Sequence, residues 1–152
     1  MEDKKWVWRT PSWVPGHTER YLTDPQSAHM WDSTNAGGPG LIPSLLLITT
    51  GRKTGELRYT PLIYQEVEEG YCVIASKGGY PSHPHWYLNL VSDPDCEIRV
   101  ANDSLKVKAR QVEGAERERL WAVMSDFYPP YDDYQARTDR PIPVLLLERL
   151  EG

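Results

Sequence analysis

A short basic turn, GRKTG at residues 51–55, is the first group of residues that could do chemistry. Arg52 and Lys53 stand side by side between two glycines, with apolar runs on both sides. Arginine offers a planar fork, and lysine a compact charge, to phosphate or carboxylate oxygens. The order differs from a P-loop, in which the Gly-Lys-Ser/Thr run ends the motif and a helix follows. The turn therefore indicates a site for a small anion, although a solvated hairpin tip would explain the same residues.

A second group of candidate residues follows a strand-like run over Tyr71–Ser76. Ser76 and Lys77 supply a hydroxyl and a cation at the end of that run, and paired glycines at 78–79 come directly after them. Glycine has no Cβ, so a ligand can approach the backbone closely there. The helix expected next carries three further candidates, Trp86, Tyr87 and Asn89.

Three tyrosines, Tyr128, Tyr131 and Tyr134, recur at every third position around the proline pair at 129–130. A regular helix cannot pass through that pair, so we expect the tyrosines to project from a turn and a short following helix. Phenols can hydrogen-bond to a polar aromatic substrate and stack on it, although tyrosines packed on a barrel surface would give the same pattern. The charged residues nearby are most simply caps and surface ion pairs: Asp132, Asp133, Asp139 and Arg140.

The histidines and cysteines do not indicate a metal site or a disulfide. No cysteine or carboxylate stands at ligand spacing near His83 and His85, so we interpret both as loop and cap residues. Cys72 and Cys96 lack CxxC spacing and lie in apolar runs, which favours two buried, reduced thiols. We therefore predict no metal.

The rest of the sequence predicts a small sheet with two helices. Six short runs are typical of strands joined mostly by hairpin-length links: Leu45–Thr50, Leu57–Tyr64, Tyr71–Ser76, Cys96–Ala101, Leu105–Arg110 and Val144–Leu150. Pro61 places the second of these at an edge, since proline cannot donate to a ladder. Amphipathic patterns predict helices over Pro84–Val91 and Ala115–Tyr128. The pattern favours a mainly β, α+β fold with a small antiparallel barrel over a parallel doubly wound sheet.

Residues 1–40 differ from the remainder because they are rich in proline, glycine and tryptophan. We expect a short helix over residues 20–32, interrupted at Pro25, and a chain break at the NAGGPG segment. We interpret residues 1–40 as an arm or lid and residues 41–152 as the barrel domain that binds any ligand.

Composition argues against some classes of function. The chain has 152 residues and a formal net charge of −5, which suits one domain and argues against a nucleic-acid binder. No apolar run approaches the roughly 20 residues of a membrane span, and the first ten residues lack a signal-peptide core. We therefore expect a cytoplasmic protein. Its 6 Trp and 9 Tyr, against 1 Phe, can line a pocket for a planar ligand, although core and boundary positions are the simpler explanation for any one of them.

Three segments, in this order and spacing, strongly resemble the deazaflavin-dependent nitroreductase family: LLLITTGRKTGELRYTPL, VIASKGGYPSHPHWYLNL and FYPPYDDYQARTDRPIPVLLLE. The likeness runs from about Ile42 to Glu148. It implies a split antiparallel β-barrel with flanking helices that binds coenzyme F420 non-covalently. It also implies hydride transfer from the reduced deazaflavin to a quinone or nitroaromatic acceptor.

The resemblance implies roles for individual residues. Arg52 and Lys53 match the basic pair beside the cofactor's phosphate and glutamate tail, while Ser76 and Lys77 match the strand-end pair beside its ring and phosphate. The other implied cofactor contacts are Thr54, Gly55, Leu57, Pro61, Gly78, Trp86, Tyr87 and Asn89. The implied substrate contacts are Trp86, Tyr128, Tyr131 and Tyr134. We expect Tyr131, with Ser76, to donate to the negative charge that builds on the acceptor oxygen.

Several alternatives stay open at this point. The chain could be a non-catalytic protein that binds a deazaflavin or flavin, or an FMN-dependent reductase with the same barrel. At the N-terminus the segment TERYLTDPQSAHMWDSTNAGG is more polar than the amphipathic helix that family members often carry. Peripheral membrane contact is therefore without support from the sequence, and the identity of the acceptor is open. A homodimer is compatible with a barrel that has free edges.

Overall fold

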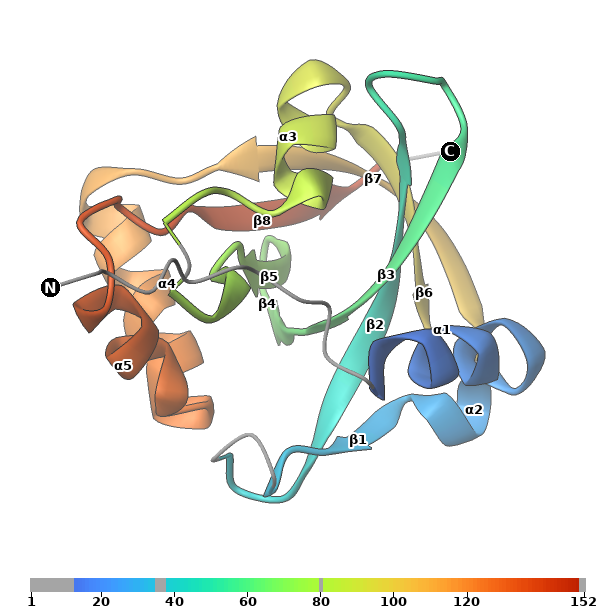
Figure 1. Cartoon of the computed structure of the whole chain (residues 1–152), viewed down its shortest axis with the longest axis horizontal. Coiled ribbons are helices and arrows are strands. Elements are labelled where there is room, and N and C mark those ends of the chain that lie inside the picture. The colour runs from blue at the N-terminus through green and yellow to red at the C-terminus, as the bar shows by residue number, and fades with distance from the viewer. Residues whose placement is uncertain (1–12, 35–37, 80, 151–152) are drawn as a thin grey trace, which may run out of the picture.

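The computed structural model describes residues 13–34, 38–79 and 81–150 (Figure 1). Within these residues the chain forms eight strands: β1 (Met30–Asp32), β2 (Leu41–Thr50), β3 (Leu57–Ile63), β4 (Gln65–Val67), β5 (Gly70–Ile74), β6 (Asp95–Val100), β7 (Asp103–Gln111) and β8 (Val144–Arg149). The same residues form five α-helices: α1 (Trp13–Thr23), α2 (Pro25–Ala28), α3 (His85–Ser92), α4 (Gly114–Phe127) and α5 (Pro130–Ala136). A short 3-10 helix, η2 (Lys77–Gly79), lies between β5 and α3.

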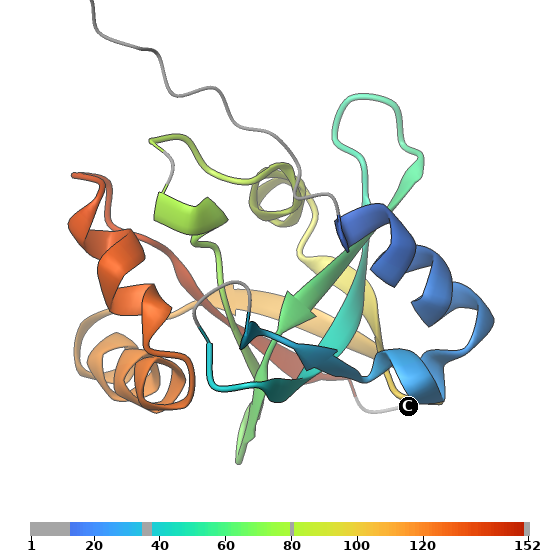
Figure 2. The same ribbon diagram turned by 60° about the horizontal axis from the view of Figure 1, so that its bottom comes forward.

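The strands form one curled sheet in which every described pair is antiparallel. Its order is β1-β2-β6-β7-β8-β5-β4, and β3 also pairs with β2. Strand β4 ends the order at one edge, and β3 pairs with β2 near the other. Because only Tyr64 separates β3 from β4 in the chain, these two edges lie close together and the sheet is curled (Figure 1). Helices α1 and α2 lie at one side of this half-barrel, and α4 and α5 lie at the other (Figure 2). The predicted antiparallel barrel with flanking helices is confirmed.

The six predicted strands correspond to β2, β3, β5, β6, β7 and β8, and the structure adds β1 and β4. The two added strands have three residues each, which is too few to display an alternating pattern. Strand β2 also begins at Leu41 rather than Leu45, because its first residues pair with β1. Among the described strands, β3 pairs only with β2, so Pro61 lies in an edge strand as predicted.

Strand β2 is apolar throughout its centre because both of its faces are covered. Leu45 and Leu47 point into the main core inside the barrel. Leu46 and Ile48 point the other way and pack against Tyr21 and Ala28 of the N-terminal helices. A strand buried on both faces has a continuous apolar run rather than an alternating one. A third buried cluster lies under α4 and α5, with Ile74 and Leu146 from the sheet and Leu120, Met124, Tyr128 and Tyr131 above them.

The N-terminal segment differs from its prediction. The helix begins at Trp13, breaks at Asp24 and ends at Ala28, while Met30–Asp32 is the strand β1. Proline starts the second helix, as its missing N–H allows. The phenol of Tyr21 fastens α1 to the sheet, since it donates to the Ser44 carbonyl at 2.7 Å and accepts from the Ala101 amide at 3.0 Å. The boundary at residue 40 and the lid role stay predictions, and residues 1–12 lie outside the described ranges.

The helices and thiols of the remaining chain follow the predictions closely. Helices α3 and α4 match the two predicted helices within one residue at each end, and α5 follows the proline pair as expected. Both cysteines are free; Cys72 is buried and Cys96 is half-buried. Burial raises the pKa of each thiol to about 12.

Candidate active site

Asn89 joins helix α3 to the basic turn at the end of β2. Asn89 is buried, with only 3% of its surface exposed. The carboxamide oxygen accepts from the backbone amide of Arg52 at 3.2 Å and from Arg52 Nη1 at 2.9 Å. The carboxamide nitrogen donates to Thr49 Oγ1 at 3.2 Å. Asn89 therefore uses both ends of its amide to fix the direction in which the turn presents Arg52.

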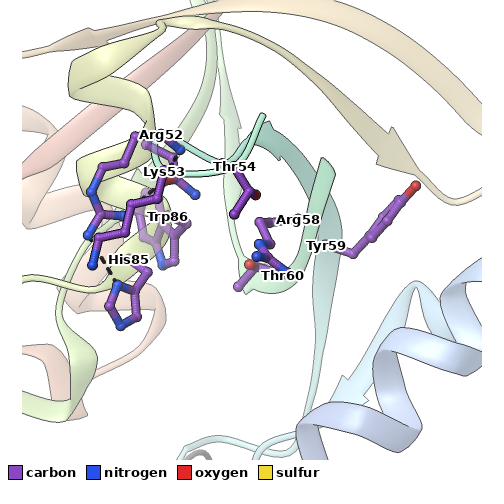
Figure 3. Close-up of a pocket in the computed structure, with 10 residues that line it drawn as sticks. Arg52, Lys53, Thr54, Arg58, Tyr59, Thr60, His85 and Trp86 are labelled. Atoms are coloured by element: carbon purple, nitrogen blue, oxygen red, sulfur yellow. Dashed lines mark hydrogen bonds between the residues drawn. The ribbon is translucent and has the colours of Figure 1, made fainter. Parts of the chain in front are cut away.

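A cavity of about 420 Å³ lies between this turn, β3 and the start of α3 (Figure 3). Arg52, Lys53 and Arg58 line it, together with the ring of Trp86, and the described lining residues include no carboxylate. Thr54 and Thr60 add hydroxyls to its wall. A concave surface with several cations and no anion favours a ligand that carries phosphate or carboxylate groups.

His85, the first residue of α3, lies against these cations. Arg52 Nη2 donates to His85 Nδ1 at 3.4 Å, and Figure 3 shows the Arg52 and Lys53 side chains extending toward the imidazole. Partial burial of the ring lowers the pKa of His85, and the charges of Arg52, Lys77 and Lys53 lower it further. Cations from two separate loops therefore act on one exposed histidine.

Arg140 holds the turn that follows β5. Its guanidinium donates to the carbonyls of Ser76 at 2.8 Å and Ala75 at 3.3 Å. The next residue, Lys77, has a φ of +46°, which is unusual for a residue with a side chain, and its Nζ donates to Ser82 Oγ at 3.4 Å. Partial burial, and then the charge of Arg140, lowers the pKa of Lys77. Arg140, expected to be a cap or a surface ion pair, is instead a donor to the backbone of the candidate site.

The three tyrosines lie together between α4 and α5. Tyr128 and Tyr131 are 2% and 4% exposed, with ring centroids 4.9 Å apart. Tyr134 is half-buried, and its hydroxyl lies 3.3 Å from that of Tyr128. Burial raises the pKa of Tyr131 well above its usual value of 10.0, so its phenol stays protonated. None of the three lines the cavity beside Arg52, and their contact with substrate stays a prediction.

Helix α5 also touches the turn that carries Lys77. Gly79 has a φ of +81°, and a Cβ at this position would come within 2.4 Å of the Tyr134 carbonyl oxygen. Only a glycine lets the two segments approach so closely. This contact places the tyrosine cluster beside the turn of Ser76, Lys77 and Gly78.

The other predicted cofactor residues are distributed unevenly. Trp86 lines the cavity, whereas the hydroxyl of Tyr87 donates to Gln111 Oε1 at 2.6 Å on β7. Gly55 is exposed at the hairpin tip, and Leu57 is 55% exposed. Pro61 is buried in β3 and, like Gly55, Leu57 and Tyr87, is not among the residues that line the cavity.

Five residues that line the cavity were not among the predicted contacts: Arg58, Thr60, His85, Gly51 and Tyr59. Arg58 and Thr60 are two positions apart on β3, so they share a face, and Figure 3 shows Tyr59 pointing to the other side. The alternating pattern of β3 indicates Arg58 and Thr60 as further candidates once the basic turn at residues 51–55 is taken as a ligand site. His85 was interpreted as a cap because metal binding was the only chemistry considered for it.

Comparison with known proteins identifies the family. Residues 20–149 match the family described as "F420H(2)-dependent quinone reductase". The chain belongs to this family. An F420H(2)-dependent quinone reductase of Mycobacterium tuberculosis (strain H37Rv) is 45% identical over 114 residues, which cover 73% of this chain and 76% of the relative. The predicted family and the class of F420-dependent oxidoreductase are therefore confirmed.

Two solved structures resemble the chain over most of its length. One, an F420-H2 dependent reductase (FDR-A), is 44% identical with a TM-score of 0.65, and the match covers 70% of this chain and 94% of that one. The other, described as a domain-swapped dimer, is 38% identical with a TM-score of 0.67, and the match covers 91% of this chain and 100% of that one.

The residues around the cavity fit the acidic part of coenzyme F420. Three cations and no carboxylate are among the described residues that line the cavity, which suits a tail that carries phosphate or carboxylate groups. Trp86 adds a large aromatic surface to the lining. Ser76, Lys77 and Gly78 are not among the described residues that line the cavity, although the charge of Lys77 acts on His85.

Proposed function

We propose that this protein reduces a quinone with a hydride from reduced coenzyme F420. Membership of the family supports both the reaction class and the cofactor. The observation that supports the proposal most directly is the cation-lined cavity between the hairpin tip and α3. When bound, the reduced deazaflavin supplies the hydride, and the protein supplies binding, orientation and electrostatics.

Binding of the anionic tail is the first task that we assign to named residues. Arg52 is held by Asn89, so its guanidinium is oriented before any ligand arrives. Lys53 and Arg58 are exposed, and Arg58 Nη2 lies 3.7 Å from Glu56 Oε2 in an exposed ion pair. The preoriented fork of Arg52 beside these two cations gives both direction and charge to the tail.

Charge stabilisation at the acceptor is the second task. Reduction of a quinone builds negative charge on an oxygen, and a donor aimed there helps most when water is excluded. We assign this role to the tyrosine cluster, with Tyr131 as the donor, Tyr128 and Tyr134 as the walls, and the Ser76 hydroxyl as a second donor. Burial keeps the pKa of Tyr131 high, so the phenol retains the proton that a donor needs.

The proposal is tested by mixing the pure protein with reduced F420 and a panel of quinones and nitroaromatics while cofactor oxidation is followed. Oxidation that depends on both protein and acceptor is the expected result. Binding of F420 without oxidation by any acceptor would favour a non-catalytic carrier. Parallel fluorescence titrations with FMN separate the deazaflavin from the flavin, and tighter binding of FMN would overturn the choice of cofactor.

We also propose that the protein forms a homodimer. The relative described as a domain-swapped dimer matches 91% of this chain, which supports self-association. Size-exclusion chromatography with light scattering measures the mass directly, and a monomer at all concentrations would contradict the proposal. In the part of the chain that the structure describes, no helix is long and apolar enough to cross a membrane.

A further inference from the structure

Among the described residues that line the cavity, only His85 has a side chain that titrates near neutral pH, and it is an exposed residue in the first turn of α3. In the part of the chain that the structure describes, the charged groups that act on His85 are cations. Arg52 and Lys53 approach from the hairpin tip, Lys77 from η2, and Arg58 lies across the cavity on β3. A protonated imidazole would therefore add a positive charge to a site that already holds several.

The contact with Arg52 defines the form of His85 in the protein without ligand. An arginine can only donate, so His85 Nδ1 accepts from Arg52 Nη2 at 3.4 Å and the imidazole is neutral. Protonation of Nδ1 would replace this contact with a repulsion between two cations. An anion placed among the same groups reverses the situation, because it accepts from the guanidinium and from a protonated imidazole together.

We propose that His85 takes up a proton when a phosphate or carboxylate group binds in the cavity, so that cofactor affinity rises as the pH falls. This inference rests on the proposed function, since the ligand is the anionic part of F420. The sign follows from linkage. Without ligand the pKa of His85 lies below its usual value of 6.5, and a bound anion raises it. The extra affinity is therefore fully present below the pKa of the free protein and is lost as the pH rises through the pKa of the complex.

The test compares F420 dissociation constants for the wild type and His85→Gln across the pH range. Their ratio removes any titration of the cofactor itself. If binding raises the pKa of His85 by about one unit, the affinity gain of the wild type over His85→Gln approaches about tenfold as the pH falls from about 8 to well below the pKa of the free protein. A ratio that does not change with pH would overturn the inference.

A matched control uses His83, which lies two residues before His85 in the segment that precedes α3. His83 contacts Arg140 and the ring of Tyr87 but does not line the cavity. His83→Gln should therefore keep the pH dependence of the wild type. If His83→Gln lost the pH dependence and His85→Gln kept it, His83 would be the residue that takes up the proton. That result would overturn the inference.

Two further measurements need no activity. NMR titration of the wild-type ring protons should place the pKa of His85 higher in the complex than in the free protein, and an equal pKa in both would contradict the inference. A deazaflavin that keeps its phosphate but lacks glutamates identifies the partner. If this compound still binds with the pH dependence, the phosphate is the anion that interacts with His85. If the pH dependence is lost, the glutamate carboxylates are that anion. If the protein bound no F420 at any pH, that result would contradict the proposed function itself and not only this inference.

Discussion

Arg52 and Asn89 form a two-point contact, in which the backbone amide and the guanidinium of one residue meet a single carboxamide oxygen of the other. The partners are 37 positions apart in the chain. Strand β2 ends where this contact begins, and α3 supplies the acceptor. The geometry of the basic turn is therefore set by a helix on the other side of the cavity.

Replacement of Asn89 by alanine should harm both stability and binding. The change leaves the Arg52 amide and Thr49 Oγ1 without their partner in a buried place, which costs about 1–3 kcal/mol in the free energy of unfolding. Urea unfolding measures that loss, and F420 titration of the folded variant should show weaker binding as well. Thr49→Val removes only the acceptor of the amide N–H, so it should lower stability while Arg52 keeps its orientation. Equal loss of affinity in both variants would contradict the role given to Asn89.

Lys53→Ala should weaken F420 binding without changing stability. Lys53 is exposed, so its removal costs little folding free energy, but it takes one cation from the cavity. We expect about a tenfold increase in the dissociation constant at low salt, with a smaller effect when salt screens the charge. Lys108→Ala, an exposed lysine on β7 that is not among the described residues lining the cavity, removes the same charge and should have a smaller effect. Tyr131→Phe should weaken binding less than Lys53→Ala does, and the reverse order would argue against these roles.

Gly79→Ala should destabilise the protein more than Gly55→Ala. Both residues have a positive φ, so each alanine carries a similar backbone cost of about 1 kcal/mol. At Gly79 the new methyl also meets the backbone of Tyr134, whereas open space surrounds Gly55. Thermal unfolding of the two variants isolates the contact between η2 and α5. Equal melting temperatures would mean that the two segments separate easily.

Arg140→Gln should weaken cofactor binding through the turn that it holds. Two carbonyls at the end of β5 lose a charged donor, which costs about 1.5–3 kcal/mol of stability at most. Lys77 is left in its left-handed conformation with less support, so F420 affinity should fall. Arg140→Lys keeps the charge but not the fork and should restore the affinity only in part. As a control, Arg119→Gln breaks an exposed ion pair with Glu69 and should change neither property by much.

The fold was largely predictable because the strongest local patterns coincide with the long strands. Runs such as Leu45–Thr50 are buried on both faces, and Leu105–Arg110 alternates between core and solvent. The short strands β1 and β4 have no pattern of their own, since three residues cannot alternate recognisably. Their positions depend on pairing with β2 and β5, which is information from the tertiary structure.

The candidate site was predictable only in part. The glycine-bracketed cations are visible in the sequence, and the family resemblance supplied Asn89 and Trp86. The role of Arg140 depends on two carbonyls 64 and 65 positions away, so no local pattern could indicate it. The burial of Tyr128 and Tyr131 could not be predicted from the sequence either. The Pro-Pro pair sets the direction of their side chains, and the packing of α4 on α5 sets their burial.

The state of the two thiols has a practical consequence for experiments on this enzyme. Burial raises both pKa values to about 12, so little of either thiol is ionised near pH 8, and the thiolate is the reactive form. A maleimide dye should therefore react slowly with Cys72 and Cys96. A single cysteine introduced at the exposed hairpin tip should be labelled in preference to them and could carry a fluorescent reporter.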